Sequence, residues 1–508
     1  MKRIGLVDIG SNTIRLVLFE YDRSTGLKEL QNIKTPARLA RYLNEDYEME
    51  DEGIDALISI LNSFRQIAEK YEVNDIYPVA TAAIRQSVNV DEILERVESE
   101  VGMKLKVITG KEEAYYGYHA VVHTISNTDA VTIDIGGGST ELTYFEDKKL
   151  IHSASLPFGV VTLKSMFFEG RDHNDKKAIA ETEKYVKEQL KSVKWLAKRK
   201  VPILAIGGSA RNIARIHQSS TNYPIAGVHG YSMTKGDLKN VYSLLKNTDS
   251  SDLDDIDGLS KDRSDIILPS TIVFRTIYDV VKADEFKFSR KGIREGMAIS
   301  IISKDYPDAF DKHEVFKESL IELANDFKIK PSASERRTEL AERLFHELEK
   351  HQYIDFEKHE KNLMKNAAYL FYVGDFIDRD ATSQHTYYLI SNSNINGIVH
   401  KDRVRLALMA SFKNKTLLQF YADETDWFDD DEIEDILALG SILKFANALN
   451  VSDTGVVKEL YLEEEDDEMV LTVEYKGDPI AEEYQANRQK KHIEKIMDED
   501  LVVKFTEN

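Results

Sequence analysis

The sequence predicts an α/β protein in which two duplicated domains are followed by an all-α domain and a small α+β module. A segment that reads strand, Asp-Ile-Gly, loop, strand occurs twice, at residues 5–20 and 131–146. Such an internal repeat predicts two similar structural units. From residue 305 to about 450, glycine becomes rare and apolar residues recur at helical spacing, which indicates helices without strands. The last 58 residues alternate short apolar runs with acidic turns, which favours strands again.

The two copies of the repeat align residue by residue. Residues Val131 to Ile135 are mostly β-branched around one acid, and they predict a short buried strand. When Asp8 is placed on Asp134, these further pairs coincide: Ile9 and Ile135, Gly10 and Gly136, Leu16 and Leu142, Phe19 and Phe145, and Glu20 and Glu146. We therefore expect each domain to carry a hairpin with the same loop, and the two loops to face a shared cleft.

The loops of both hairpins have the composition of phosphate-binding turns. Glycine allows a ligand to approach the backbone, and consecutive N–H groups in such a turn converge on an anion. A third strand–glycine–helix junction follows the strand expected at 201–206, and the N-terminus of a helix also attracts anions. A plain glycine-rich β-hairpin is the alternative for these loops. The candidate phosphate-binding residues are Ser11, Asn12, Thr13, Gly136, Gly137, Gly138, Ser139, Thr140, Gly207, Gly208 and Ser209.

Apolar periodicity predicts the remaining elements in order. Helices are expected at residues 53–71, 91–101, 109–123, 176–200, from about 210, 266–281 and 292–304. Strands are expected at 76–81 and 104–108, and a further strand and turn at 156–163. In the C-terminal module we expect strands at 456–462, 469–475 and 501–505, and one helix at 480–497.

Four further motifs narrow the assignment: Thr81-Ala-Ala-Ile-Arg85, Gly110-Lys-Glu-Glu-Ala114, Ile206-Gly-Gly-Ser-Ala210 and Gly292-Ile-Arg-Glu-Gly296. Together with the two Asp-Ile-Gly loops, and in this order, they resemble the exopolyphosphatase/guanosine pentaphosphate phosphatase (Ppx/GppA) family of the actin/Hsp70/sugar-kinase superfamily. The chain is most similar to a long-form exopolyphosphatase. The resemblance implies two actin-like (ribonuclease H-like) domains at 1–125 and 126–304, a helical HD-like domain at 305–450, and a small acidic α+β domain at 451–508.

The resemblance also assigns two catalytic residues. Glu113 would be the general base that deprotonates the attacking water, and the guanidinium of Arg85 would stabilise charge on the transferred phosphoryl group. The residues alone leave alternatives open. Acids in the first turn of a helix usually complement the helix dipole, which applies to both Glu112 and Glu113, and Arg85 could form a surface ion pair.

Three carboxylates are candidate metal ligands. Asp134 and Glu141 offer the hard oxygen ligands that Mg²⁺ or another divalent cation prefers. Asp8 could share this task from the opposite domain, and a role for K⁺ is left open by the sequence. No serine–histidine or cysteine nucleophile arrangement is visible, so direct attack by water is favoured over a covalent phosphoenzyme.

The HD-like domain departs from its family pattern. A metal-binding HD domain needs a His-Asp pair, and the corresponding positions here are Phe371 and Tyr372. Aromatic side chains cannot ligate a hard divalent cation as carboxylate and imidazole do. We therefore expect this domain to be structural, or to bind substrate or form a dimer, and we expect His385 to be a core histidine.

Charge and composition limit the partners. The net charge is −22, and residues 451–508 alone hold 7 Lys/Arg against 17 Asp/Glu. This balance argues against nucleic-acid binding. The chain has no cysteine, which excludes disulfides and fits a reducing compartment, and no apolar run is long enough to span a bilayer. We expect a cytoplasmic homodimer without stable membrane insertion.

A polyanionic substrate needs a local basic surface on so acidic a protein. In the helix expected at 176–200, Lys187, Lys191 and Lys194 recur at steps of four and three, which places them on one face. They are the predicted polyphosphate track, and an ordinary solvated face is the alternative.

The predicted function is processive hydrolysis of the terminal phosphate of inorganic polyphosphate by metal-assisted attack of water. A guanosine pentaphosphate (pppGpp) 5′-phosphohydrolase is the first alternative, because both activities share the motifs. An ATP-dependent kinase of the same superfamily and a non-catalytic, actin-type nucleotide-binding scaffold are more remote. The Glu-Glu-Ala motif and the HD-like domain favour the phosphohydrolase.

Overall fold

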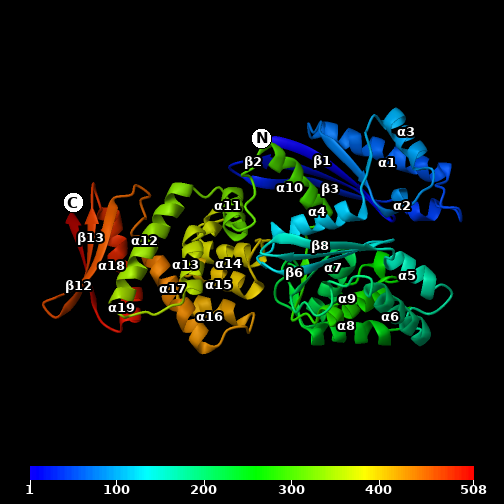
Figure 1. Ribbon diagram of the computed structural model, residues 1–508. Coiled ribbons are helices and arrows are strands. Elements are labelled where there is room, and N and C mark those ends of the chain that lie inside the picture. Colours follow the sequence, from blue (N-terminus) through cyan, green and yellow to red (C-terminus); the bar gives the residue numbers. More distant parts are fainter. The chain divides into compact units, whose positions relative to one another are not determined.

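The computed structural model describes residues 1–508, which form two compact units (Figure 1). The first unit comprises residues 1–223 and 228–318, and the second comprises 224–227 and 319–508. The first unit contains both copies of the Asp-Ile-Gly repeat. No helix combines the length and the hydropathy that crossing a lipid bilayer requires.

The first copy of the repeat lies in a five-stranded sheet of order β3-β2-β1-β4-β5. Its strands are β1 (Lys2–Ile9), β2 (Thr13–Asp22), β3 (Gly26–Pro36), β4 (Ile76–Ala80) and β5 (Lys106–Val107). The chain runs antiparallel through β1, β2 and β3, and β4 then pairs parallel with β1. Helices α1 (Asp51–Lys70), α2 (Ala82–Arg85) and α3 (Val90–Val101) complete this domain, with a short 3₁₀ turn, η1 (Leu39–Tyr42).

The second copy lies in a six-stranded sheet of order β10-β11-β9-β6-β7-β8. Its strands are β6 (Ala130–Ile135), β7 (Thr140–Glu146), β8 (Lys149–Leu156), β9 (Ile203–Ile206), β10 (Ser232–Met233) and β11 (Phe286–Ser289). The register repeats that of the first sheet, because Asp134 pairs with Glu141 as Asp8 pairs with Arg15. The helices are α5 (Val160–Phe167), α6 (Lys176–Leu190), α7 (Gly207–Ser220), α8 (Lys235–Asn247) and α9 (Ile267–Val281). The predicted duplication is confirmed.

Two helices lie between these sheets (Figure 1). Helix α4 (Gly110–Val122) packs its buried side chains against the second sheet, and α10 (Ile293–Asp305) packs against the first. The two helices also pack on each other. A Cβ on Gly296 of α10 would lie 1.9 Å from the carbonyl oxygen of Tyr116 of α4, so this close approach requires glycine.

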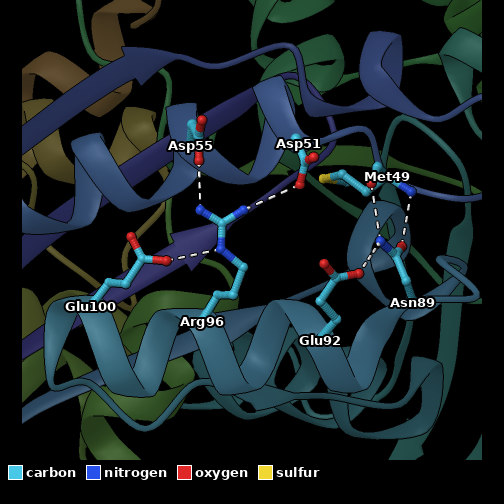
Figure 2. A network of polar contacts seen from close by, with 7 residues as sticks. All are labelled: Met49, Asp51, Asp55, Asn89, Glu92, Arg96 and Glu100. Atoms are coloured by element: carbon cyan, nitrogen blue, oxygen red, sulfur yellow. Dashed lines mark hydrogen bonds and ion pairs between the residues drawn. The ribbon is translucent and has the colours of Figure 1, made fainter.

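A network of polar contacts links α3 to α1 on the surface of the first domain (Figure 2). The guanidinium of Arg96 bonds Asp55, Asp51 and, within its own helix, Glu100. Exposed ion pairs of this kind contribute little, ~1 kcal/mol or less each. The apolar residues between the helices, which belong to one core with β1 and β2, therefore hold the layer together.

The second unit is helical and ends in a small sheet. Its helices are α12 (Pro331–Lys350), α13 (Lys358–Tyr369), α14 (Thr382–Asn392), α15 (His400–Ala410), α16 (Lys415–Asp423) and α17 (Asp430–Ala448), preceded by α11 (Val315–Asp326), which begins in the first unit. The sheet has the order β12-β13-β14, with strands β12 (Val457–Glu465), β13 (Glu468–Tyr475) and β14 (Leu501–Glu507). Two short helices, α18 (Ile480–Gln489) and α19 (Lys491–Met497), stand where one was expected. The predicted order of an all-α segment and an α+β module is confirmed.

Phe371 and Tyr372 fold into this helical unit as packing residues. Their rings stack with centroids 4.2 Å apart, and the Tyr372 hydroxyl donates to the carbonyl oxygen of Phe412 at 3.0 Å.

Two local predictions are wrong. The strand expected at 156–163 ends at Leu156, and helix α5 follows, because the backbone N–H of Gly159 donates to Thr162 Oγ1 at 2.7 Å and caps a new helix. The helix expected at 176–200 ends at Leu190. Beyond it the N–H groups of Lys198 and Lys200 donate to carbonyls at the end of α9, so the chain follows α9 and does not continue α6.

Candidate active site

Three neighbouring parallel strands of the second sheet end at the same edge. Asp134 at the end of β6 lies beside Ile206 of β9, and Ile206 in turn lies beside Ser289 of β11. The carboxyl ends of parallel strands are where ligands usually bind in α/β sheets. The residues that leave this edge are therefore candidates for the site: the loop after Asp134, the start of α7, and Arg290.

The structure brings the two predicted phosphate loops together. Each closes with the same backbone bond, from Gly10 N to Thr13 O at 3.1 Å and from Gly136 N to Ser139 O at 2.9 Å. A Cβ on Gly137 would lie 3.4 Å from Cβ of Ser11. The loops of both domains thus lie next to each other, as the duplication predicts. Thr140 is bonded within the protein, because its hydroxyl donates to Phe158 O at 2.7 Å.

The two glutamates at the start of α4 have different roles in the structure. Glu112 closes a capping box with Thr109 and forms an ion pair with Lys106 at 2.6 Å. Glu113 is 7% exposed, and Arg85 Nη1 donates to its Oε2 at 3.0 Å. Arg85 is itself held by a second bond from Nη1, to the carbonyl oxygen of Ile108 at 2.8 Å. Glu113, not Glu112, is the buried carboxylate.

Glu113 lies among other carboxylates. The first turn of α4 approaches β7 and β8, since a Cβ on Gly110 would lie 2.5 Å from Ser155 Oγ and 3.9 Å from Glu141 Oε1. Burial raises the pKa of Glu113 to about 7, with the charges of Asp134 and Asp8 adding to the shift and Arg85 opposing it. A glutamate with this pKa can accept a proton near neutral pH.

The other acids are also held at raised pKa. Burial raises the pKa of Asp134 to about 6, and the charge of Asp8 adds to this effect. Burial, then the charges of Glu113 and Asp134, hold the pKa of Glu141 well above its usual value, against the hydrogen bonds from Ser139 and Ser155. Burial raises the pKa of Asp8 as well, although Arg294 and Arg15 oppose it. The site therefore concentrates negative charge that a bound cation would stabilise.

The donor set suits a hard cation that keeps water ligands. No group of three or more His, Asp or Glu side chains converges closely enough to form a complete cage. Mg²⁺ usually binds through one or two carboxylates, waters and the substrate phosphates, so a complete protein cage is not required. Asp134 and Glu141, directly opposite each other across β6 and β7, fit this need. Asp8 differs, because Arg294 Nη1 approaches its Oδ2 at 4.0 Å.

The third predicted loop adjoins the acids. Gly207 has φ +92°, and a Cβ there would lie 2.8 Å from Asp134 Oδ1, so the start of α7 can lie this close to Asp134 only because residue 207 is glycine. A Cβ on Gly208 would lie 2.3 Å from Cζ of Arg263, whose Nη1 also approaches Ser209 Oγ at 3.4 Å. The loop is therefore already in contact with a cation of the protein.

Sequence reasoning missed the arginines of this region. They are Arg15, Arg211, Arg215, Arg263, Arg290 and Arg294. Two of them had a sequence signal: Arg294 lies in the Gly-Ile-Arg-Glu-Gly motif, and Arg211 directly follows the Ile-Gly-Gly-Ser-Ala motif. The predicted lysine track loses its helical face, because α6 ends before Lys191, and Lys191 pairs with Glu188 at 2.6 Å.

Comparisons with known proteins agree with this architecture. Residues 18–305 match the model of the Ppx/GppA phosphatase family, and residues 315–489 match that of Ppx/GppA phosphatase domain III. A bifunctional 3-dehydroquinate synthase/phosphatase of Fusobacterium nucleatum is 26% identical over 291 residues, which are 55% of this chain and 43% of that protein. The chain thus spans less than half the length of this curated relative.

Solved structures match about three-fifths of the chain. The crystal structure of the Aquifex aeolicus member of the Ppx/GppA family is 27% identical, with a TM-score of 0.55 over 60% of this chain and 98% of that one. An exopolyphosphatase from Cytophaga hutchinsonii is 21% identical, with a TM-score of 0.55 and the same coverage. At that identity the second likeness supports the fold alone.

Proposed function

We propose that this chain, which belongs to the Ppx/GppA phosphatase family, is an exopolyphosphatase that removes the terminal phosphate of inorganic polyphosphate. One observation carries the proposal. A buried glutamate with a pKa of about 7, Glu113, is held by Arg85 beside two phosphate-type loops and the carboxylates of Asp134 and Glu141. Phosphoryl transfer needs this combination of positioning, charge neutralisation and an aligned nucleophile.

In the proposed reaction a water oxygen attacks the terminal phosphorus. The bond from that phosphorus to the bridging oxygen breaks, and the chain leaves one phosphate shorter. The carboxylate of Glu113 accepts the proton of the water, and Arg85, bonded to it at 3.0 Å, fixes its orientation. The N–H groups of Gly10 and Gly136 close the loops, and backbone N–H groups of residues 11–13 and 137–139 would bind the phosphate oxygens. Mg²⁺ bound through Asp134 and Glu141 would neutralise charge on these oxygens.

The same machinery would also serve pppGpp, whose 5′-terminal phosphate is a phosphoric anhydride of the same kind. Phosphate release from long-chain polyphosphate, pppGpp and ATP, measured side by side at equal concentrations, tests the choice. We expect the highest kcat/KM on polyphosphate. A higher value on pppGpp would make the nucleotide phosphohydrolase the better assignment, and release from none of the three would contradict both.

The neighbouring glutamates provide a matched pair of variants for the mechanism. Glu113→Gln should lower kcat about 10²–10⁴-fold, the usual effect of losing a general base, with KM little changed. Glu112→Gln keeps an acceptor for the capping box and loses only the ion pair with Lys106, so it should cost ~1 kcal/mol of stability or less. If Glu112→Gln abolishes activity and Glu113→Gln leaves it intact, the base is assigned to the wrong residue.

A further inference from the structure

A serine hydroxyl is bound to one of the proposed metal ligands. Ser155, on β8, donates a hydrogen bond to Glu141 Oε1 at 2.9 Å. Glu141 is 3% exposed, whereas Ser155 is itself exposed, so the hydroxyl bonds a carboxylate that is almost out of reach of solvent. No step of the proposed reaction uses Ser155. Hydrogen-bond partners of ligating carboxylates orient the ligands and so contribute to metal affinity.

Ser155 belongs to a row of residues that crosses three strands of the second sheet. Asp134 on β6 pairs with Glu141 on β7, and Glu141 pairs with Ser155 on β8. Residues directly opposite each other in antiparallel strands have their side chains on the same face, with Cβ atoms ~5 Å apart. The two proposed ligands and the hydroxyl therefore stand side by side on one face of the sheet.

The start of α4 packs on the Ser155 side chain. A Cβ on Gly110 would lie 2.5 Å from Ser155 Oγ and 2.7 Å from Ser155 Cβ, so this approach of the backbone requires glycine. The same Cβ would lie 3.9 Å from Glu141 Oε1. Glu113 follows three residues later in the same helix. Ser155 thus contacts both the proposed metal ligand and the helix that carries the proposed base.

The first copy of the repeat has no such hydroxyl. In the corresponding row of the first sheet, Asp8 pairs with Arg15, and Arg15 pairs with Lys34 on β3. Arg15 stands where the second copy has Glu141, and Lys34 stands where it has Ser155. The copy without the glutamate is therefore also the copy without the serine. This comparison within one chain associates the hydroxyl with the glutamate and not with the architecture of the sheet.

We propose that Ser155 is a positioning residue that fixes the carboxylate of Glu141 for metal binding. A glutamate side chain has several rotatable bonds, and its carboxylate reaches a given point only in some of their combinations. The bond from Ser155 to Oε1 selects one orientation before the cation binds. A hydroxyl suits this task because it donates to a carboxylate without adding a charge that would oppose the cation. The inference rests on the proposed function, which makes Glu141 a metal ligand.

The test is binding of Mn²⁺ to the full chain without substrate, measured from the electron paramagnetic resonance signal of the free ion. Mn²⁺ takes the same oxygen ligands as Mg²⁺. Ser155→Ala should weaken this binding roughly 10-fold, the lower end of the usual effect of losing a ligand's partner, because water can partly replace an exposed hydroxyl. Ser153→Ala is the matched control, since Ser153 lies on the same face of β8 but opposite Thr143, and it should leave binding within about twofold.

Phosphate release provides a second readout. In Ser155→Ala the Mg²⁺ concentration that gives half the maximal rate on polyphosphate should rise by the same factor as the Mn²⁺ dissociation constant. At saturating Mg²⁺, kcat should stay within about threefold of wild type, because Glu113 and Arg85 are unchanged. A merely structural role of Ser155 would instead lower the unfolding midpoint and kcat, and would leave the Mg²⁺ dependence unchanged.

Ser155→Cys separates the hydrogen bond from the packing. A thiol is similar in size to a hydroxyl but is a weak donor, so Ser155→Cys should bind Mn²⁺ as weakly as Ser155→Ala does. Wild-type Mn²⁺ affinity in either variant would overturn the inference. The binding assay also separates this outcome from a failure of the proposed function. A chain that releases no phosphate from any substrate can still lose Mn²⁺ affinity in Ser155→Ala, whereas a wild-type chain that binds no Mn²⁺ would overturn the metal assignment and the inference together.

Discussion

The protonation of Glu113 gives the sharpest prediction about the reaction. Burial among carboxylates raises its pKa from 4.5 to about 7. A general base acts only when ionised, so kcat/KM should rise with pH below this value and level off above it. About half of the sites are active at pH 7, about a tenth at pH 6 and about a hundredth at pH 5. The assay is kcat/KM for polyphosphate across pH 5–10 at constant ionic strength.

Replacing Arg85 changes the pKa of Glu113 and so tests this assignment. Its Nη1 donates to Glu113 Oε2 at 3.0 Å, and this bond and its charge oppose the rise in the pKa of Glu113. Arg85→Gln should therefore move the acid limb of the pH profile upward by ~1–3 pH units. The measured quantity is the midpoint of the limb, which separates this effect from the charge that Arg85 supplies to the transition state. A limb that stays near pH 7 in Arg85→Gln would refute the assignment of Glu113 as the base.

The same pKa shift has a consequence for stability with a defined sign. The folded pKa of Glu113 lies above its unfolded value, so the folded state holds the proton more tightly, and stability falls as pH rises from 4.5 to about 7. A shift of this size corresponds to ~3 kcal/mol when fully developed. Glu113→Gln should consequently unfold at higher denaturant concentration than wild type at pH 8, and this difference should disappear at pH 4.5. A destabilised Glu113→Gln at pH 8 would contradict the reasoning.

Three further predictions concern the metal and the loops. Asp134→Asn should abolish phosphate release with the fold intact by circular dichroism, and activity near wild type at saturating Mg²⁺ would contradict the metal assignment. Gly207→Ala should lower phosphate release at least ~10-fold, because a Cβ there would lie 2.8 Å from Asp134 Oδ1. Gly170→Ala is the control, because Gly170 also has a positive φ, +69°, but has no neighbour within 4 Å. It should lower only the stability of the protein, by the ~1–2 kcal/mol of backbone strain. The double variant Asp134→Asn, Glu141→Gln removes the proposed metal ligands, and the HD-like domain has Phe371 and Tyr372 where a metal-binding His-Asp pair would stand. Elemental analysis of this variant should therefore find no stoichiometric divalent ion, and a tightly held ion would contradict this.

The repeat could be predicted because its structure depends on residues that are close in the sequence. The strand, the Asp-Ile-Gly turn and the returning strand each depend on residues close in the chain, and the seven-residue spacing from Asp8 to Arg15 and from Asp134 to Glu141 fixes the ladder register. The prediction of a helix over 176–200 was wrong because a tertiary contact determines the conformation of its second half. Apolar spacing continues past Leu190, but the chain there bonds the end of α9, which no local pattern records.

The arginines were missed for a related reason. Arg211, Arg215, Arg290 and Arg294 are spread over more than eighty residues, and they meet because β9 and β11 end at one edge of the sheet. The lysines of the expected track are close in sequence, so periodicity found them. Periodicity reports which residues share a helix face, but it does not report which faces have carboxylates nearby. Which charged side chains gather at one edge of the sheet therefore follows from the fold and not from local periodicity.

The two copies of the repeat differ at one paired position of the hairpin, and this difference gives the two hairpins different charges. In the first copy Asp8 lies opposite Arg15, and the cation offsets the carboxylate. In the second copy Asp134 lies opposite Glu141, and burial together with the charges of Glu113 and Asp134 raises the pKa of Glu141, so that its ionisation costs free energy. A divalent cation would relieve that cost in the second hairpin but would meet Arg15 and Arg294 in the first. The duplicated scaffold thus supports a metal-binding hairpin facing an arginine-bearing one. Replacing Arg15 with Glu would copy the second hairpin into the first, and should weaken binding of the anionic substrate.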